Sequence, residues 1–200
     1  MKEKKNDERP VALLDMDGTV ADYDYQMGAD LGKMRSPIEK KTKYGDYFKD
    51  NRDSSYMQAR MRAIKAVGSW WENLPKRKLG FDIVRLLRKH DFRIVICTQG
   101  PKFVPVAWSH KVSWCMKNLP DVEITITRDK SLQYGRILVD DFTGYIKPWL
   151  KHRPRGLVIM PATPENAEFK HPNVIRYDGT NIAAVEERII YTRNRPNGEL

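Results

Sequence analysis

Cysteine and histidine are scarce in this sequence. Its 200 residues include two cysteines, Cys97 and Cys115, which are too few for a disulfide framework and lie in no CxxC motif. The four histidines share no spacing typical of a zinc site. We therefore expect two buried thiols, and neither a zinc centre nor a disulfide-stabilised fold.

Long apolar runs are absent as well. No stretch approaches the roughly 18 to 20 apolar residues that a membrane-spanning helix needs. The first ten residues, MKEKKNDERP, lack the apolar centre of a signal peptide. We expect a soluble, cytoplasmic protein with no membrane partner, whose oligomeric state the sequence does not predict.

Charge, in contrast, is plentiful and unbalanced. Hydrophobic residues make up 40% of the chain and charged residues 31%, which is typical of a folded domain rather than a disordered or collagen-like chain. The 36 basic residues exceed the 26 acidic ones, which gives a net charge of +10. This charge favours anionic partners such as nucleic acids, nucleotides and other phosphate esters.

Short runs rich in β-branched residues alternate with segments of helical spacing. The runs predict strands at 11–14, 92–98, 122–127, 136–140, 156–160 and 173–177. Apolar residues at intervals of three and four predict helices over 81–87, 104–119 and 182–189. Strands that are apolar at nearly every position favour an α/β fold, with a parallel sheet covered by helices on both faces.

The segment 25–75 interrupts this alternation. It is rich in Lys, Arg, Met and Tyr and contains no convincing strand. One amphipathic helix is marked by Met57, Met61, Ile64 and Val67, with Ser54 or Ser55 as its cap. We expect a small helical insert at 25–75 after the first strand, and a core formed by 1–24 and 76–200.

Pairs of acidic residues follow two of the predicted strands. Asp15 and Asp17 end the first strand, and Asp140 and Asp141 end the fourth. The carboxyl ends of parallel strands converge on one edge of a sheet, where ligands bind. The carboxylates would repel one another unless a cation neutralised them, and an all-oxygen ligand set suits Mg²⁺. An Asp-x-Asp-Gly turn held by Asx hydrogen bonds is the alternative explanation for the first pair.

Donors for a phosphate group occur at the same predicted edge. Thr98 closes the second strand and Lys130 follows the third. A lysine considered alone is more often a solvated surface residue. Four strand ends that carry an acid, a hydroxyl, an amine and an acid favour one shared phosphate site.

The run Leu14-Asp-Met-Asp-Gly-Thr-Val20, followed in order by Thr98, Lys130 and Asp140-Asp141, resembles the four-motif pattern of the haloacid dehalogenase (HAD) superfamily of phosphohydrolases. Segments such as Ile126-Thr-Arg-Asp-Lys130 are similar to those of the 5′(3′)-deoxyribonucleotidases. The resemblance spans most of the core and implies a Rossmann-like, HAD-like fold with the insert as a cap.

The resemblance also implies a mechanism. Asp15 would attack phosphorus and Asp17 would act as the acid and base, while Mg²⁺ would bind Asp15, the backbone carbonyl of Asp17, and Asp140. Asp141 would support the metal. The transferring phosphate is assigned to the Thr98 hydroxyl, the Lys130 ammonium and the backbone N–H groups of Gly18 and Gln99.

The sequence departs from the family pattern at two positions. Gln99 and Phe142 stand where the family commonly has Ser and Arg. A backbone N–H survives any change of side chain, so Gln99 leaves phosphate binding intact. The absence of the Arg would alter the choice of sugar or base, and Lys102, which matches a family Lys, is expected to compensate.

Aromatic residues of the insert are candidates for binding a base. Tyr23 and the pair Trp70-Trp71 match aromatic positions of the nucleotidases, and such rings stack on nucleobases. Packing of the cap is an equally good explanation for each tryptophan, and Tyr47 and Phe48 are weaker candidates.

The sequence thus predicts a Mg²⁺-dependent phosphoric monoester hydrolase acting on (deoxy)nucleoside 5′- or 3′-monophosphates. Two alternatives stay open: a phosphatase for DNA or RNA ends, and a non-catalytic nucleic-acid-binding module on the same fold. The net charge motivates the first of them. Short basic clusters at 40–43, 76–78 and 151–155 are candidates for a track that binds a polyanion, and a solvated surface is the alternative explanation for them.

Overall fold

Residues 7–39 and 54–196 are described by the structure, a computed structural model. The basic cluster at 40–43, together with Tyr47 and Phe48, lies outside the described residues. Contacts between Cα atoms group the chain into two units. The first unit comprises Met1–Val20, Arg77–Gln99 and Val122–Leu200, and the second comprises Ala21–Lys76 and Gly100–Asp121.

This grouping differs from the predicted division chiefly at one helix. The segment Gly100–Asp121 is grouped with the insert, as are residues 21–24 and 76, whereas the sequence assigned all of them to the core. The division into a catalytic core and a cap stays a prediction.

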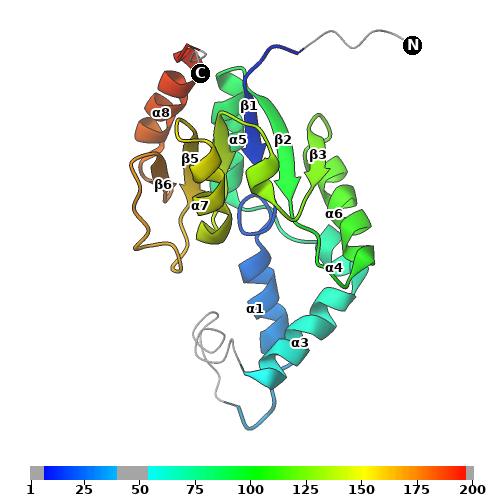
Figure 1. Cartoon of the computed structure of the whole chain (residues 1–200). Helices are drawn as coiled ribbons and strands as arrows, with labels where there is room; N and C mark the ends of the chain where they lie inside the picture. The colour runs from blue at the N-terminus through cyan, green and yellow to red at the C-terminus, as the bar shows by residue number, and fades with distance from the viewer. Residues whose placement is uncertain (1–6, 40–53, 197–200) are drawn as a thin grey trace, which may run out of the picture. The chain divides into compact units, whose positions relative to one another are not determined.

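The first unit is built on a six-stranded, fully parallel sheet with the order β3-β2-β1-β4-β5-β6 (Figure 1). Each strand lies within one residue of its predicted bounds, which confirms the α/β prediction. The strands are β1 (Val11–Leu14), β2 (Arg93–Thr98), β3 (Glu123–Ile126), β4 (Ile137–Val139), β5 (Leu157–Pro161) and β6 (Val174–Tyr177).

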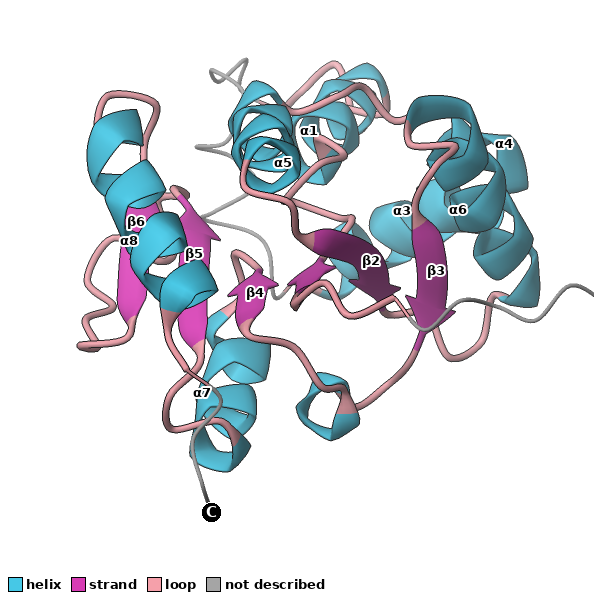
Figure 2. Cartoon of the chain, turned by 90° about the horizontal axis from the view of Figure 1, so that it is seen from above, coloured by secondary structure: helices cyan, strands magenta, loops and turns pink. Residues whose placement is uncertain are grey.

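Helices cover both faces of this sheet. Figure 2 shows α5 (Lys78–Lys89) and α8 (Ile182–Asn194) on one face and α7 (Thr143–His152) on the other. Alternate strand residues such as Leu13, Leu138 and Val158 pack with Trp149 of α7. Both sheet faces are therefore buried, which explains why the strands read as continuous apolar runs.

The pairing register brings the ends of the central strands to one edge. Leu14, the last residue of β1, pairs with Ile96 of β2 and with Val139 of β4. The N–H of Asp15 continues the ladder and donates to the carbonyl of Val139 at 2.9 Å. Polar residues that directly follow these strands consequently share the carboxyl edge of the sheet.

The described part of the second unit is helical. It contains α1 (Tyr23–Lys33), α3 (Ser55–Ala66), α4 (Gly68–Glu72) and α6 (Pro105–Asn118). Met57, Met61 and Ile64 of α3 pack against Met27 and Leu31 of α1. The amphipathic helix predicted in the insert is thus confirmed as α3, and Ser54 is its N-cap residue. None of the helices in the described ranges has the length and apolar character of a membrane span.

A buried carboxylate joins α5 to β6 in the first unit. The Asp82 side chain is 1% exposed, and it accepts hydrogen bonds from Lys78 Nζ at 2.7 Å and from the Tyr177 hydroxyl at 2.9 Å. Arg85 also forms an ion pair with it. Burial opposes the charged form of Asp82, but these partners outweigh burial and lower its pKa below the usual value.

We expect Asp82→Asn to lower the free energy of unfolding by about 1.5–3 kcal/mol at pH 7, because charge-assisted hydrogen bonds are lost. A carboxyl whose pKa is lower in the folded state stabilises the fold above its unfolded pKa of about 3.9, and this contribution disappears as the pH falls through the folded pKa. Urea unfolding at pH 7 and near pH 2.5 measures the effect. At the lower pH the free energy of unfolding of the variant should approach that of the wild type. A difference that is the same at both pH values would contradict this explanation, and so would an equal loss of stability in the exposed-site control Glu165→Gln.

Candidate active site

A buried lysine joins two of the predicted acids at the carboxyl edge of the sheet. Lys130 Nζ lies 2.7 Å from Asp15 Oδ1 and 2.6 Å from Asp140 Oδ2. The Lys130 side chain is 0% exposed and the Asp15 side chain 9% exposed. Asp15 and Asp140 come from adjacent strands, β1 and β4, so the convergence predicted from the sequence is realised in the structure.

Local structure turns the lysine inward. Lys130 opens a short 3-10 helix, η1 (Lys130–Leu132), whose N-cap residue Asp129 accepts hydrogen bonds from the backbone N–H and the hydroxyl of Ser131 at 2.9 and 2.6 Å. The Lys130 ammonium also lies 4.5 Å from the centre of the Tyr145 ring. Lys130 is therefore held by its cap, an aromatic ring and two carboxylates, and is not a solvated surface residue.

Asp141 is fixed against the loop that follows β1. Its Oδ1 accepts a hydrogen bond from the Thr19 hydroxyl at 3.0 Å, and its backbone carbonyl accepts one from Asn166 Nδ2 at 3.1 Å. Gly18 in the same loop has φ +71°. The loop after β1 and the end of β4 are thus locked together through Asp141.

The electrostatics of the cluster follow from burial. Burial raises the pKa of Asp140 to about 6, although Lys130 opposes the shift. Burial also opposes the charge of Lys130, but Asp140 and Asp15 outweigh it and raise the pKa of the ammonium above its usual value. Cys97, predicted to be a buried thiol, is buried beneath the site, and burial raises its pKa to about 12.

Three carboxylates suit a metal ion. One oxygen each from Asp15, Asp140 and Asp141 lies within 4.8 Å of the other two. These three carboxylates, of which Asp15 and Asp140 are buried and Asp141 is partly exposed, lie near the ammonium of Lys130, and three negative charges against one positive charge leave an excess of two. Hard oxygen ligands and an uncompensated double charge fit a divalent cation such as Mg²⁺.

Other predicted phosphate ligands lie at the same edge. Thr98 ends β2 and is buried, and its carbonyl accepts from the N–H of Thr127 at 2.9 Å. Gln99 follows directly and is partly exposed. Asp17 and Gly18 lie in the loop after β1, between Asp15 and Thr19.

The residues predicted to bind a base lie together in the second unit. The Tyr23 ring is 5.4 Å from the Trp70 ring and 5.9 Å from the Trp71 ring. Trp71 is 2% exposed and its indole N–H donates to the carbonyl of Lys65 at 3.0 Å, which favours a packing role for this tryptophan. Lys102 also belongs to the second unit, where it lies 5.1 Å from the Phe103 ring. Base binding and the supporting role of Lys102 stay predictions.

No model of a protein family matches the sequence, and no curated protein matches it. Solved structures do match. A haloacid dehalogenase-like hydrolase from Burkholderia xenovorans gives a TM-score of 0.52 at 15% identity, covering 92% of this chain and 98% of that chain. A haloacid dehalogenase-like family hydrolase from Xanthomonas campestris gives 0.52 at 15% identity, with 94% and 99% covered. A HAD hydrolase of family IA, variant 3, from Entamoeba histolytica gives 0.52 at 12% identity, with 93% and 100% covered.

The fold is that of the haloacid dehalogenase-like hydrolases. At these identities the likeness concerns the fold and not the activity. The closer resemblance to the 5′(3′)-deoxyribonucleotidases stays a prediction.

Several residues that organise this candidate site were not predicted. Arg77 donates to the carbonyl of Gly18 and, at 2.7 Å, to that of Ala162. Asn166, Thr19 and Tyr145 hold Asp141 or flank Lys130 as described above. The sequence does contain a pattern that could have pointed to Thr19, because this residue belongs to the Asp-Met-Asp-Gly-Thr run. No local pattern points to Arg77 or Asn166. The partners of Arg77 lie 59 and 85 residues away along the chain, and that of Asn166 lies 25 residues away.

The backbone of Gly18 lies so close to the Asp141 side chain that no residue with a Cβ atom fits at position 18 without a shift. A Cβ atom at position 18 would lie 2.6 Å from Asp141 Oδ2, and φ +71° is strained for any side chain. We expect Gly18→Ala to reduce the phosphatase activity predicted from the sequence by about 10²-fold through misplacement of Asp141, and to lower the free energy of unfolding by about 1–3 kcal/mol.

Gly32→Ala is the matched control, because no atom outside its chain neighbours and the backbone of its own helix lies within 4 Å of a Cβ at that position. It should leave activity unchanged and raise stability by about 0.5–1 kcal/mol. Urea unfolding and steady-state kinetics measure both variants, and full activity of Gly18→Ala would show that the contact with Asp141 is unimportant.

Proposed function

We propose that this protein is a Mg²⁺-dependent phosphatase that hydrolyses phosphomonoesters through an aspartyl-phosphate intermediate on Asp15. The observation that carries the proposal is the cluster of buried Asp15, Lys130 and Asp140 with partly exposed Asp141 at the carboxyl edge of a HAD-like sheet. A structural ion pair would need one acid for one lysine. Three acids around one lysine, at the edge where α/β proteins bind ligands, favour a catalytic site.

The metal would be held by Asp15, Asp140 and the backbone carbonyl of Asp17, with Asp141 beside them. When bound, Mg²⁺ supplies positive charge to the oxygens of the phosphate group. The Lys130 ammonium would also supply positive charge to these oxygens. Two of its three N–H donors reach Asp15 and Asp140, which leaves one for a phosphate oxygen. Thr98 and the backbone N–H groups of Gly18 and Gln99 would complete the phosphate cradle.

The reaction needs two steps. In the first, a carboxylate oxygen of Asp15 forms a bond to phosphorus, the bond from phosphorus to the ester oxygen breaks, and Asp17 gives its proton to the leaving alkoxide. In the second, Asp17 takes a proton from water, the water oxygen bonds to phosphorus, and the bond to Asp15 breaks. Inorganic phosphate leaves, and both carboxyl groups return to their starting protonation states.

We further propose that the substrates are nucleoside monophosphates, and deoxynucleotides in particular. The net charge of +10 attracts phosphate esters. In the second unit Trp70 is partly exposed and lies in an aromatic group with Tyr23, which is the kind of surface on which bases stack.

Phosphate release from a substrate panel tests these proposals. The panel contains 5′- and 3′-nucleoside monophosphates with ribose and deoxyribose, a phosphorylated sugar without a base, and oligonucleotides phosphorylated at either end. Each substrate is assayed with Mg²⁺ and with a chelator. Mg²⁺-dependent release that is fastest from mononucleotides is the expected result. Faster release from oligonucleotides would favour an end phosphatase, faster release from the sugar phosphate would remove the nucleotide proposal, and no release would remove the phosphatase proposal.

A further inference from the structure

A pocket rich in arginine opens at the opposite edge of the first unit. Its volume is about 440 Å³. Four arginines, one tyrosine and one acid contribute most of its polar lining: Glu8, Arg9, Tyr134, Arg136, Arg193 and Arg195. No residue of the proposed catalytic site is among its lining residues.

The pocket lies at the amino-terminal edge of the sheet. Val11, the first residue of β1, and Arg136, which directly precedes β4, both line it. Asp15 and Asp140 follow the other ends of the same two strands. A strand of four residues at about 3.3 Å per residue separates the two edges by roughly 13 Å, so one small ligand cannot occupy both sites.

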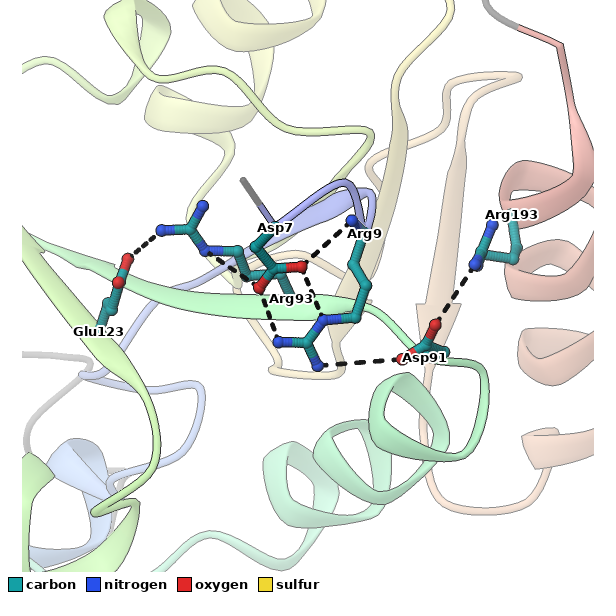
Figure 3. A network of polar contacts seen from close by, with 6 residues as sticks. All are labelled: Asp7, Arg9, Asp91, Arg93, Glu123 and Arg193. Atoms are coloured by element: carbon teal, nitrogen blue, oxygen red, sulfur yellow. Dashed lines mark hydrogen bonds and ion pairs between the residues drawn. The ribbon is translucent and has the colours of Figure 1, made fainter. Parts of the chain in front are cut away.

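A chain of ion pairs balances part of the charge here. Figure 3 shows this chain, in which acids and arginines alternate. Arg9 contacts Asp7 at 2.7 Å, and Asp91 connects Arg9 and Arg193 at 3.9 and 3.4 Å. The charges of this chain of ion pairs balance, because three arginines face three carboxylates: Arg9, Arg93 and Arg193 with Asp7, Asp91 and Glu123.

Three further arginines gather beside that balanced chain. Arg136 Nη1 donates to the carbonyls of Thr192, Arg193 and Arg195 at 3.2, 3.3 and 2.8 Å, which fixes its guanidinium at the carboxyl end of α8. Arg155 donates to the carbonyl of Pro196 at 3.0 Å, and Arg195 donates to the carbonyl of Arg155.

Carbonyl groups hold the Arg155 and Arg195 side chains without cancelling their charge. Across the described ranges, neither Arg155 nor Arg195 forms an ion pair with a carboxylate. Burial lowers the pKa of Arg195, and the positive charges of Arg155 and Arg136 lower it further, so both of these guanidiniums are close enough to repel that of Arg195. One carboxylate in the lining, Glu8, offsets part of this charge.

Such a cluster is most stable with an anion of more than one charge between the guanidiniums, and guanidinium forks bind phosphate oxygens in pairs. We infer that the arginine pocket at the amino-terminal edge of the sheet is a second anion site, which binds adjacent phosphate groups carried by a small polyphosphate or by a nucleic-acid strand. Tyr134 is 65% exposed in the lining and offers a flat ring next to the guanidiniums.

Equilibrium binding of two probes tests the inference. One probe is inorganic tripolyphosphate, followed by calorimetry. The other is a fluorescent single-stranded DNA of about 12 nucleotides without terminal phosphate, followed by anisotropy at about 50 mM salt. A chelator is present throughout, which removes metal-assisted binding at the catalytic edge. The variant is Arg155→Ala/Arg195→Ala, and the matched control Lys117→Ala/Lys170→Ala removes two exposed charges elsewhere.

The arginine variant should bind at least one probe about tenfold more weakly than the wild type and the lysine control, and the slope of log affinity against log salt should fall by about 1 to 2. Tighter binding of tripolyphosphate identifies a small-molecule site, and tighter binding of DNA identifies a nucleic-acid site. Arg155→Lys/Arg195→Lys should bind more tightly than the alanine variant, because it keeps both charges, and more weakly than the wild type, because lysine lacks the guanidinium fork. The inference is overturned by no binding to the wild type, by equal losses in the alanine variant and the control, or by a lysine replacement that binds more weakly than the alanine variant.

Discussion

Replacing Asp15 with asparagine should abolish phosphate release, with a fall in the catalytic rate constant of about 10⁴-fold or more, the usual consequence of removing a nucleophile. An amide oxygen is neutral and a poor nucleophile, so no aspartyl phosphate forms. Lys130 keeps Asp140 as a partner, and the folded state is therefore expected to survive. Steady-state phosphate release with Mg²⁺ measures the loss, and circular dichroism checks the fold.

The same substitution at the other edge of the sheet is the control. Asp91 has a side chain that is 64% exposed and a φ of 54°, a conformation that asparagine adopts readily. Asp91→Asn should keep wild-type activity, since only surface ion pairs of about 0–1 kcal/mol are disturbed. If Asp15→Asn retained more than about a hundredth of the wild-type rate, Asp15 would not be the nucleophile.

The sheet and the acidic cluster could be predicted because both depend on short-range patterns. Each strand is a run of β-branched residues, and a parallel arrangement forces all carboxyl ends to one edge. Asp15 and Asp140 directly follow strands, Thr98 ends one, and Lys130 lies four residues after another, so their positions needed little beyond the strand assignments. Asp15 and Asp140 meet through Lys130, as the pattern required.

Elements with a weak pattern were missed. The predicted helices did not include α7, because Gly144 near its start and Pro148 inside it are unfavourable in helices. Gly28 and Gly32 obscure α1 in the same way. Both helices form because tertiary packing overrides low intrinsic propensity, with Trp149 and Met27 as buried anchors. Hydrogen bonds such as those from Arg77 and Asn166 join distant segments, and no local pattern encodes them.

The largest effect on stability is expected at Lys130. Lys130→Met keeps the length of the side chain but removes the ammonium that faces Asp15 and Asp140. Both carboxylates would then be buried without their cation, and breaking a buried pair in this way costs about 3–5 kcal/mol. Urea unfolding in a chelator measures the loss. Added Mg²⁺ should recover part of it, because binding to the folded state alone raises stability.

The exposed-site control Lys151→Met should change stability by no more than about 0.5 kcal/mol. A double variant separates charge from packing. If uncompensated charge causes the loss, Asp15→Asn/Lys130→Met should be more stable than the sum of the two single effects predicts, by about 0.5–3 kcal/mol, because the second change removes one of the stranded carboxylates. Strictly additive losses would mean that Lys130 stabilises the fold through packing against Tyr145 rather than through its charge. The excess of carboxylates over the ammonium of Lys130 would then no longer support a cation site at this edge.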